Sequence, residues 1–164
     1  MRCSTVSQAP PTGTHLREIG ISNLRAVMAL EVTAAQSNFV AGVRSSLQEA
    51  EEAPDANPWY RAVYDALTPV GFVMLSDNIP PGNPELLGPY YLWRLLIDKN
   101  HQGKRYGTRA LDLCIEYVRT RPHAEALLTS VVQEPGSPLP FYLKYGFHKT
   151  GEVVEDEIVL RLPL

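Results

Sequence analysis

Apolar positions recur along this chain with two different periods, and together they predict a mixture of strands and helices. The clearest helix is predicted over residues 107–120, where Leu111, Cys114, Ile115 and Val118 return at helical spacing. Residues 59–77 alternate apolar and polar positions around a turn near residues 67–69, which predicts two paired strands. Two shorter apolar runs, at residues 90–98 and 125–132, predict further strands, and the second run is apolar enough for a strand buried on both faces.

Shorter elements are predicted before these runs by residues that begin or end local structure. Residues 15–20 predict a short strand that a glycine ends. Ser22 is expected to cap a helix over residues 23–30, because a serine hydroxyl can accept a hydrogen bond from a free N–H of the first turn. A second helix is expected from about Ser45 to just before Pro54.

The C-terminal part of the chain carries equally clear signals. Residues 137–146 predict a short helix with Ser137 as its cap, Pro138 in its first position and Gly146 at its end. Residues 147–164 predict a closing β-hairpin whose turn lies near residues 151–155. The predicted order, β-α-α-β-β-β-α-β-α-β-β, indicates an α+β (mixed α/β) fold with helices flanking a mixed sheet.

Composition narrows the class of protein. The chain has 164 residues, of which 45% are hydrophobic and 20% charged, and this suits a single domain with a packed core. A net charge of -3 gives no electrostatic case for nucleic acid as a partner. No apolar run is long enough for a membrane span, and no secretory signal is expected. Cys3 and Cys114 lack metal-ligand spacing, so we expect no metal and a cytoplasmic location.

The stretch NHQGKRYGTRAL, residues 100–111, joins a predicted strand to the best predicted helix. Gly103 and Gly107 allow a close approach of the backbone, and the first N–H groups of a helix favour an anionic ligand such as phosphate. Lys104, Arg105 and Arg109 add positive charge. Neither a Walker motif nor a G-x-G-x-x-G motif is present, so the stretch by itself is consistent with a plain turn or with a phosphate cradle.

A wider pattern of motifs bears on that choice. QGKRYG at residues 102–107, FYLKYGF at residues 141–147 and the closing hairpin together resemble the GNAT superfamily of acetyl-CoA-dependent acetyltransferases. That family has a Q/R-x-x-G-x-G/A turn before its third helix and a Tyr-containing helix that ends in Gly-Phe. Gln102 and Gly107 match the turn, whereas Arg105 replaces its middle glycine. Shorter segments are similar to a bacterial diamine or spermine/spermidine acetyltransferase subgroup.

The resemblance implies a fold and a coenzyme site. It implies a mostly antiparallel seven-stranded sheet that is splayed in the middle and flanked by about four helices. Residues 15–164 would form one acetyltransferase domain, after a flexible tail over residues 1–14. Acetyl-CoA is the implied co-substrate, with its pyrophosphate on the turn and its pantetheine arm along the fourth strand. The implied coenzyme-binding residues are Leu95, Leu96, Ile97, Gln102, Gly103, Lys104, Arg105, Tyr106, Gly107, Thr108, Ser137, Phe141 and Tyr145.

The resemblance also implies the catalytic chemistry. Tyr142 matches the tyrosine that acts as general acid toward the leaving thiolate, and a phenol can supply that proton. The family's carboxylate on the fourth strand is missing, which leaves Glu31, Glu49 or a chain of waters as candidates for the base and the substrate contacts. His101 and His148 have no identifiable partners. The acceptor pocket is expected within about residues 22–60.

The expected reaction is transfer of acetyl from acetyl-CoA to a primary amine, by direct attack through a tetrahedral intermediate. The first candidate for the acceptor amine is a small polyamine or diamine, the second is an aminoglycoside, and the third is a protein or peptide amine. A non-catalytic acyl-CoA-binding module and a plain structural domain are the alternatives. The expected partners are acetyl-CoA and the amine, without nucleic acid or membrane. Family members are often homodimers, but no interface is evident in the sequence.

Overall fold

The computed structural model describes residues 12–164 as seven strands and four α-helices, with one short 3-10 helix. The expected tail over residues 1–14 therefore falls largely outside the described residues, although the first strand already begins at Thr14. The strands are β1 (Thr14–Arg17), β2 (Pro58–Asp65), β3 (Thr68–Ser76), β4 (Tyr91–Ile97), β5 (Ala126–Val131), β6 (His148–Val154) and β7 (Glu157–Pro163). The helices are α1 (Leu24–Met28), α2 (Val43–Glu52), η1 (Pro54–Ala56), α3 (Tyr106–Arg119) and α4 (Leu139–Tyr145).

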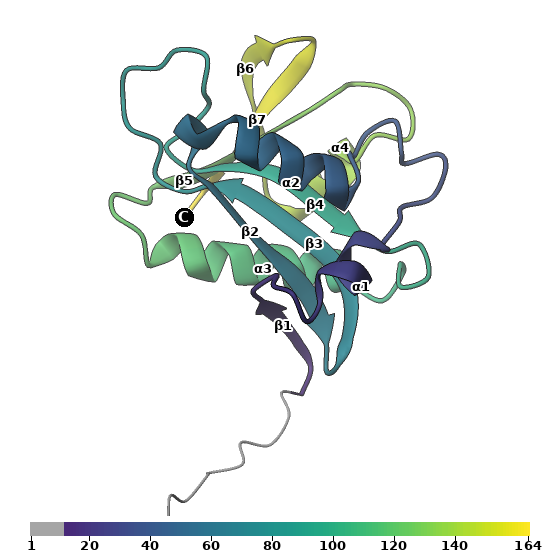
Figure 1. Cartoon of the computed structure of the whole chain (residues 1–164). Helices are drawn as coiled ribbons and strands as arrows, with labels where there is room; N and C mark the ends of the chain where they lie inside the picture. The colour runs from purple at the N-terminus through teal and green to yellow at the C-terminus, as the bar shows by residue number, and fades with distance from the viewer. Residues whose placement is uncertain (1–11) are drawn as a thin grey trace, which may run out of the picture.

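All seven strands form one sheet in the order β1-β2-β3-β4-β5-β7-β6. Every neighbouring pair is antiparallel except β4 and β5, which are parallel and are in register only at Tyr91 and Leu128. The sheet therefore opens between β4 and β5, as Figure 1 shows in the middle of the molecule. The predicted α+β fold with a splayed, mostly antiparallel sheet is confirmed.

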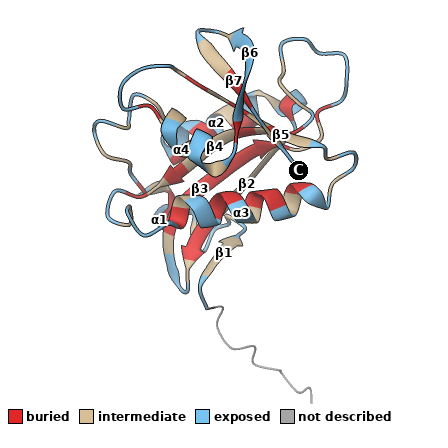
Figure 2. Ribbon diagram, turned by 180° about the vertical axis from the view of Figure 1, so that it is seen from behind, coloured by how far each residue is buried: buried red, intermediate tan, exposed pale blue. Residues whose placement is uncertain are grey.

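Two hydrophobic clusters cover the two faces of this sheet. The first packs the apolar side of α3, including Leu111 and Cys114, together with Tyr142 of α4 against strand residues such as Leu127. The second packs Val27 of α1 and helix α2 against the other face. Figures 1 and 2 show α2 and α3 on opposite sides of the sheet. Because both faces are covered by helices, the opening between β4 and β5 lies inside a two-sided layered structure.

Three local expectations need correction. The strand over residues 125–132 is not buried on both faces, because β5 alternates buried and half-buried positions and Ser130 faces the less buried side. Ser22 makes no cap: Asn23 is the N-cap of α1, and its side-chain amide bonds the backbone of the preceding turn. Pro138 is the N-cap of α4 rather than its first helical residue, while the Ser137 hydroxyl accepts a hydrogen bond from the Leu139 N–H at 3.3 Å.

Candidate active site

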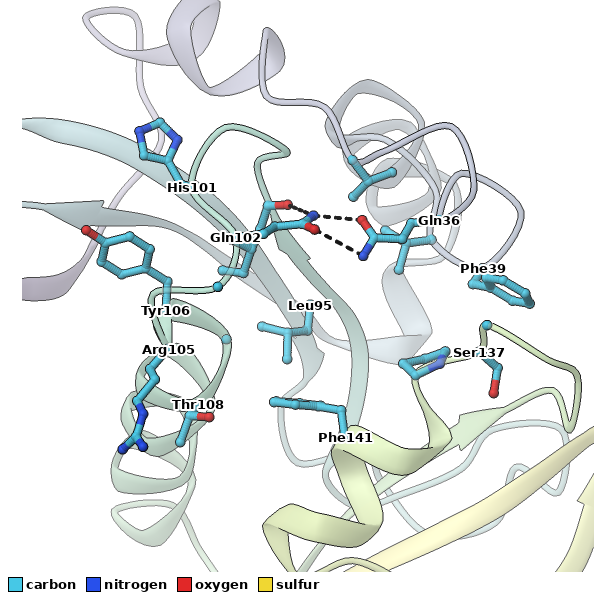
Figure 3. A pocket seen from close by; sticks show the side chains of 17 residues that line it. Gln36, Phe39, Leu95, His101, Gln102, Arg105, Tyr106, Thr108, Ser137 and Phe141 are labelled. Carbon is cyan, nitrogen blue, oxygen red and sulfur yellow. Dashed lines mark hydrogen bonds between the residues drawn. The ribbon is translucent and has the colours of Figure 1, made fainter.

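A cavity of about 430 Å³ lies between the end of β4, the start of α3 and the start of α4, and the loop after α1 closes its remaining side. Figure 3 shows side chains from all of these segments pointing toward this space. Most of the residues that the sequence assigned to a coenzyme meet here, although they come from distant parts of the chain. Those that line the cavity are Leu95, Ile97, Gln102, Gly103, Arg105, Tyr106, Gly107, Thr108, Ser137 and Phe141.

The turn before α3 has a left-handed backbone at two positions. Gly103 has φ +76°, and Arg105, the N-cap of α3, has φ +66° and ψ +18°. An L-residue in this region costs about 1–2 kcal/mol, which accounts for the preference for glycine at the position of Arg105. Arg105 nevertheless adopts the conformation, and the Arg109 N–H donates to its carbonyl at 3.1 Å. The N–H groups of the first helical residues therefore stay free of partners within the helix, at the edge of the cavity.

The Gln102 side chain connects this turn to β4 and to the loop after α1 by hydrogen bonds. Its Nε2 donates to the Gln36 Oε1 at 2.7 Å and to the Ile97 carbonyl at 3.0 Å, and the Gln36 Nε2 donates back to its Oε1 at 3.2 Å. Figure 3 shows the two amides facing each other across the upper part of the cavity. The first residue of the motif thus joins the loop after α1 to β4 and to the turn, which holds the cavity wall in place.

His101 has a partner that the sequence did not indicate. Its Nδ1 lies 3.2 Å from Asp98 Oδ2, and Asp98 also accepts from the backbone N–H groups of Glu31 and Asn100. Burial raises the pKa of Asp98, but these hydrogen bonds outweigh burial and leave the pKa below its ordinary value. Asp98 therefore holds the turn as an anion. The side chain of Glu31 points elsewhere, pairs with Lys99 at 2.9 Å and is largely exposed.

The orientation of β4 decides which main-chain groups face the opening of the sheet. The Asp98 N–H donates to the carbonyl of Val70 in β3 at 2.8 Å, so the main-chain groups of Asp98 point toward β3. The direction of these groups alternates from one residue to the next along a strand, so the N–H and C=O groups of Leu95 and Ile97 point away from β3, toward the opening between β4 and β5. The hydrogen bond of Ile97 is consistent with this direction, because its carbonyl accepts from the Gln102 side chain, which lies on the side away from β3. Leu96 is buried in the opposite core cluster, so its side chain packs the sheet and does not line the cavity.

A second, smaller cavity of about 100 Å³ continues from the first one. The two cavities share Phe39, Val40, Leu95 and Pro138 in their walls. Tyr142 lines the smaller cavity and is only 6% exposed. Burial raises the pKa of Tyr142 well above its ordinary value of about 10, and the neighbouring Tyr91 adds to that rise. The phenol of Tyr142 therefore stays protonated.

The remaining predicted residues lie outside both cavities. The Tyr145 hydroxyl donates to Asp112, and its ring packs against Phe141 and Phe147. Lys104 is exposed on the turn. Glu49 lines neither cavity, but its Oε2 lies 2.5 Å from Nη2 of Arg94, and this arginine lines the smaller cavity.

The smaller cavity is lined mainly by strand residues, and residues 22–60 contribute Asn38, Phe39 and Val40 to its wall. Tyr91, Trp93 and Arg94 come from β4, Ser130 from β5, and Glu157 from the first position of β7. Sequence reasoning missed these residues, because no local motif marks them. The available signal was strand alternation: Ser130 is a polar residue within an apolar run, and Glu157 follows the turn of the last hairpin.

Comparison with known proteins agrees with this geometry. A model of the acetyltransferase (GNAT) family matches residues 25–147, so the chain belongs to the GNAT family. It is an acetyl-CoA-dependent N-acetyltransferase. Like other members, it uses acetyl-CoA as co-substrate.

Two curated relatives from Bacillus subtilis cover 85% of this chain and 90% of their own length. "Probable spermine N(1)-acetyltransferase" of subspecies natto (strain BEST195) is 23% identical over 139 residues. "Spermine/spermidine N(1)-acetyltransferase" of strain 168 is 22% identical over 139 residues.

Solved structures share the fold at low sequence identity. Aminoglycoside acetyltransferase AAC(6')-Ib in complex with coenzyme A superposes with a TM-score of 0.71 at 16% identity, over 92% of this chain and 95% of that one. The PaiA N-acetyltransferase of Thermoplasma acidophilum, also in complex with coenzyme A, gives a TM-score of 0.64 at 15% identity, over 93% and 100%. Within residues 12–164, no helix has the length and apolar character of a membrane span, and no cluster of three or more metal-ligating side chains occurs.

Proposed function

We propose that this N-acetyltransferase acts on a small linear polyamine or diamine, with the coenzyme in the larger cavity and the amine in the smaller one. The observation that carries the proposal is that the two cavities meet at Leu95 and Pro138, and that Tyr142 lines the smaller one. A thioester at this junction would be accessible from both sides. The junction also lies where β4 and β5 separate, so an extended chain has room to enter between them.

The turn before α3 fits a pyrophosphate. Gly103 carries no side chain into the cavity, and even an added Cβ would meet nothing within 4 Å. The free N–H groups of Tyr106, Gly107 and Thr108 begin a helix of 14 residues, whose dipole favours an anion at this end. Arg105 and Lys104 are exposed beside the turn and add positive charge. In Figure 3 the Arg105 side chain runs along α3, so it leaves the main-chain donors uncovered.

The pantetheine arm would pair with β4 as an additional strand. The Leu95 and Ile97 main chains face the splay, and one of their N–H groups could donate to the thioester carbonyl, where negative charge develops during attack. Phe141 and the apolar side of Leu95 would line the arm. Bound acetyl-CoA supplies the activated acetyl group. Tyr142 would then donate a hydrogen bond or a proton to the departing sulfur.

The raised pKa of Tyr142 refines this role. A phenol with a pKa well above 10 is a weaker acid than a thiol of ordinary pKa near 8.5, so complete proton transfer to the sulfur would be uphill. A strong hydrogen bond to the developing thiolate needs no complete transfer. We therefore assign Tyr142 chiefly to stabilising the leaving sulfur, as a donor that remains protonated over the whole physiological range.

The size of the acceptor cavity favours a linear amine. An engineered protein cavity of about 150 Å³ holds one benzene molecule, so a cavity of about 100 Å³ suits an aminoalkyl arm better than a sugar ring. The names of the two Bacillus relatives point to the same substrate class. Trp93 and Tyr91 offer aromatic surface to a cation, and Glu49 compensates the charge of Arg94 in the wall.

The test is release of free thiol from acetyl-CoA in the presence of spermidine, putrescine, an aminoglycoside or a lysine peptide. We expect the two linear amines to give the highest kcat/KM. A higher value for the aminoglycoside or the lysine peptide would refute the substrate class. Tight acetyl-CoA binding without thiol release for any amine would instead indicate a binding module.

A further inference from the structure

Three side chains in the acceptor cavity form a hydrogen-bonded chain that the coenzyme site does not use. The Tyr91 hydroxyl lies 2.6 Å from Ser130 Oγ, and the Ser130 hydroxyl donates to Glu157 Oε2. A serine hydroxyl has one proton, and here it points to the carboxylate. Tyr91 must therefore be the donor to Ser130, so both hydrogen bonds run in one direction and end at Glu157.

Sheet geometry brings these side chains together. Tyr91 is the β4 residue in register with β5, just before the two strands separate. Ser130 pairs with Val159 of β7, and Glu157 lies two residues before Val159, so Ser130 and Glu157 share one face of the sheet. All three residues line the same cavity as Tyr142. The hydrogen-bonded chain therefore lies along the wall of the cavity that the proposed function assigns to the amine.

We propose that Tyr91, Ser130 and Glu157 form a proton relay that takes the proton from the attacking amine and delivers it to Glu157. The inference rests on the proposed function, because it needs an amine in the smaller cavity. It supplies the missing base: β4 carries no carboxylate, Glu31 pairs with Lys99, and Glu49 pairs with Arg94. Glu157 is the one carboxylate among the described residues that line this cavity.

The proton balance closes within the relay. The amine arrives as an ammonium ion and must lose one proton before its nitrogen can attack the acyl carbon. The ammonium gives this proton to the Tyr91 oxygen, Tyr91 gives its own proton to Ser130, and Ser130 gives its own to Glu157. As the neutral nitrogen bonds to the acyl carbon and the carbon–sulfur bond breaks, the second proton of the nitrogen goes to the departing sulfur. Tyr91 and Ser130 end neutral, as they began, and Glu157 becomes a carboxylic acid. Because Glu157 is half-buried, it can return the proton to water.

The charged surroundings are compatible with this direction. Arg94 of β4 also lines the cavity, but Glu49 lies 2.5 Å from its guanidinium. Burial, chiefly, raises the pKa of Tyr91, so its hydroxyl stays protonated and ready to donate. The hairpin turn residue Glu155 adds negative charge near Tyr91, and Tyr142 of α4 stays neutral. Tyr91 contacts the amine in this scheme, whereas Ser130 and Glu157 act through it.

The experiment measures kcat, the KM of each substrate and acetyl-CoA affinity for Glu157→Gln, Ser130→Ala and the double variant, using the best amine of the panel. Glu152→Gln is the matched control, because it removes one carboxylate from an exposed position of the same hairpin. General acid–base groups contribute at least about 10²-fold to a rate. We expect kcat to fall about 10²-fold in each single variant and no further in the double variant, because both break one relay. The control should match the wild type, and acetyl-CoA affinity should not change.

Dependence on pH separates the relay from a structural role. Between pH 7 and pH 10 a growing share of an alkylamine is neutral, so the ratio of wild-type to Glu157→Gln kcat should shrink, whereas a packing defect would keep it constant. A kcat within twofold of wild type in Glu157→Gln would overturn the relay and leave the proposed function standing, as would a rise in amine KM alone. If the wild-type chain binds acetyl-CoA but acetylates no amine, the proposed function fails and the relay fails with it.

Discussion

The left-handed backbone at Arg105 makes a quantitative prediction for Arg105→Gly. Arg105 makes no side-chain hydrogen bond or ion pair within the described residues, so its replacement removes no such contact. Relief of the left-handed conformation is worth about 1–2 kcal/mol. Glycine also gives the unfolded chain more freedom, which costs about 0.5–1 kcal/mol. We therefore expect Arg105→Gly to stabilise the protein by about 0.5–1 kcal/mol.

Lys104→Gly is the matched control for this change. Lys104 is the preceding residue, equally basic and exposed, but its φ is not positive. Lys104→Gly therefore gives the unfolded chain more conformational freedom but relieves no backbone strain, so it should lower the free energy of unfolding by about 0.5–1 kcal/mol. For a domain of this size, 1 kcal/mol shifts Tm by about 2–4 °C, so the two variants should move Tm in opposite directions.

Thermal unfolding without ligand and calorimetric titration with coenzyme A separate the two roles of Arg105. Each variant loses one positive charge beside the turn, so we expect coenzyme affinity to fall about 3- to 10-fold in both, since tenfold corresponds to about 1.4 kcal/mol. Equal decreases of Tm in both variants would refute the strain at Arg105. Unchanged coenzyme affinity in both would show that the main-chain donors bind the pyrophosphate without help from these charges.

Three further predictions concern the hydrogen-bond donor Tyr142, the packing of β3 at Gly71, and stability at alkaline pH. Tyr142→Phe should lower kcat about 10²-fold with unchanged acetyl-CoA affinity, and an unchanged rate at saturating substrate would remove the residue from its donor role. Gly71→Ala should lower the free energy of unfolding, measured in urea, by about 3 kcal/mol, because the new Cβ would lie 2.4 Å from the Leu96 carbonyl oxygen. Gly20→Ala is the control: a Cβ there meets nothing within 4 Å, so the free energy of unfolding should change by no more than about 0.5 kcal/mol. Equal effects of the two changes would contradict the close packing of β3 on β4. Burial and the hydrogen bond to Asp77 raise the pKa of Tyr117 to about 12. In the unfolded chain the Tyr117 phenol ionises near pH 10, so between about pH 10 and 12 the unfolded state has lost this proton while the folded state still holds it, and the free energy of unfolding should fall. Tyr117→Phe lacks the phenol, so its free energy of unfolding should fall by about 1 kcal/mol less over this range, after allowance for solvent screening. Identical slopes for both proteins would argue against that shift.

The turn that lines the larger cavity could be predicted from the sequence because it is a local motif. Gly103, Gly107 and the helix that follows encode a turn and a free helix N-terminus within a few residues. The left-handed conformation of Arg105 was the point that the sequence left open. The structure keeps the turn geometry there, since the neighbouring segments hold it, and the strain is small compared with the packing of α3.

The partner of His101 and the orientation of Leu96 could not be predicted in the same way. His101 was assigned no partner, because Asp98 becomes one only when the turn folds back on the end of β4. Leu96 belonged to a run of three apolar residues, and only the register with β3 decides that its side chain faces the opposite core. An extra residue at the bulge near Met74 shifts this alternation, and a sequence pattern does not reveal such a shift.

The sequence by itself determined the order of helices and strands, the glycine-containing turn before α3 and the place of Tyr142 in a short helix, because each depends on preferences expressed over a few neighbouring residues. Only the tertiary structure decided which polar groups meet around the smaller cavity. Tyr91 and Ser130 lie 39 positions apart, and Ser130 and Glu157 lie 27 positions apart. Their meeting depends on the order of the strands and on where β4 and β5 separate, and long-range packing of the whole sheet sets both.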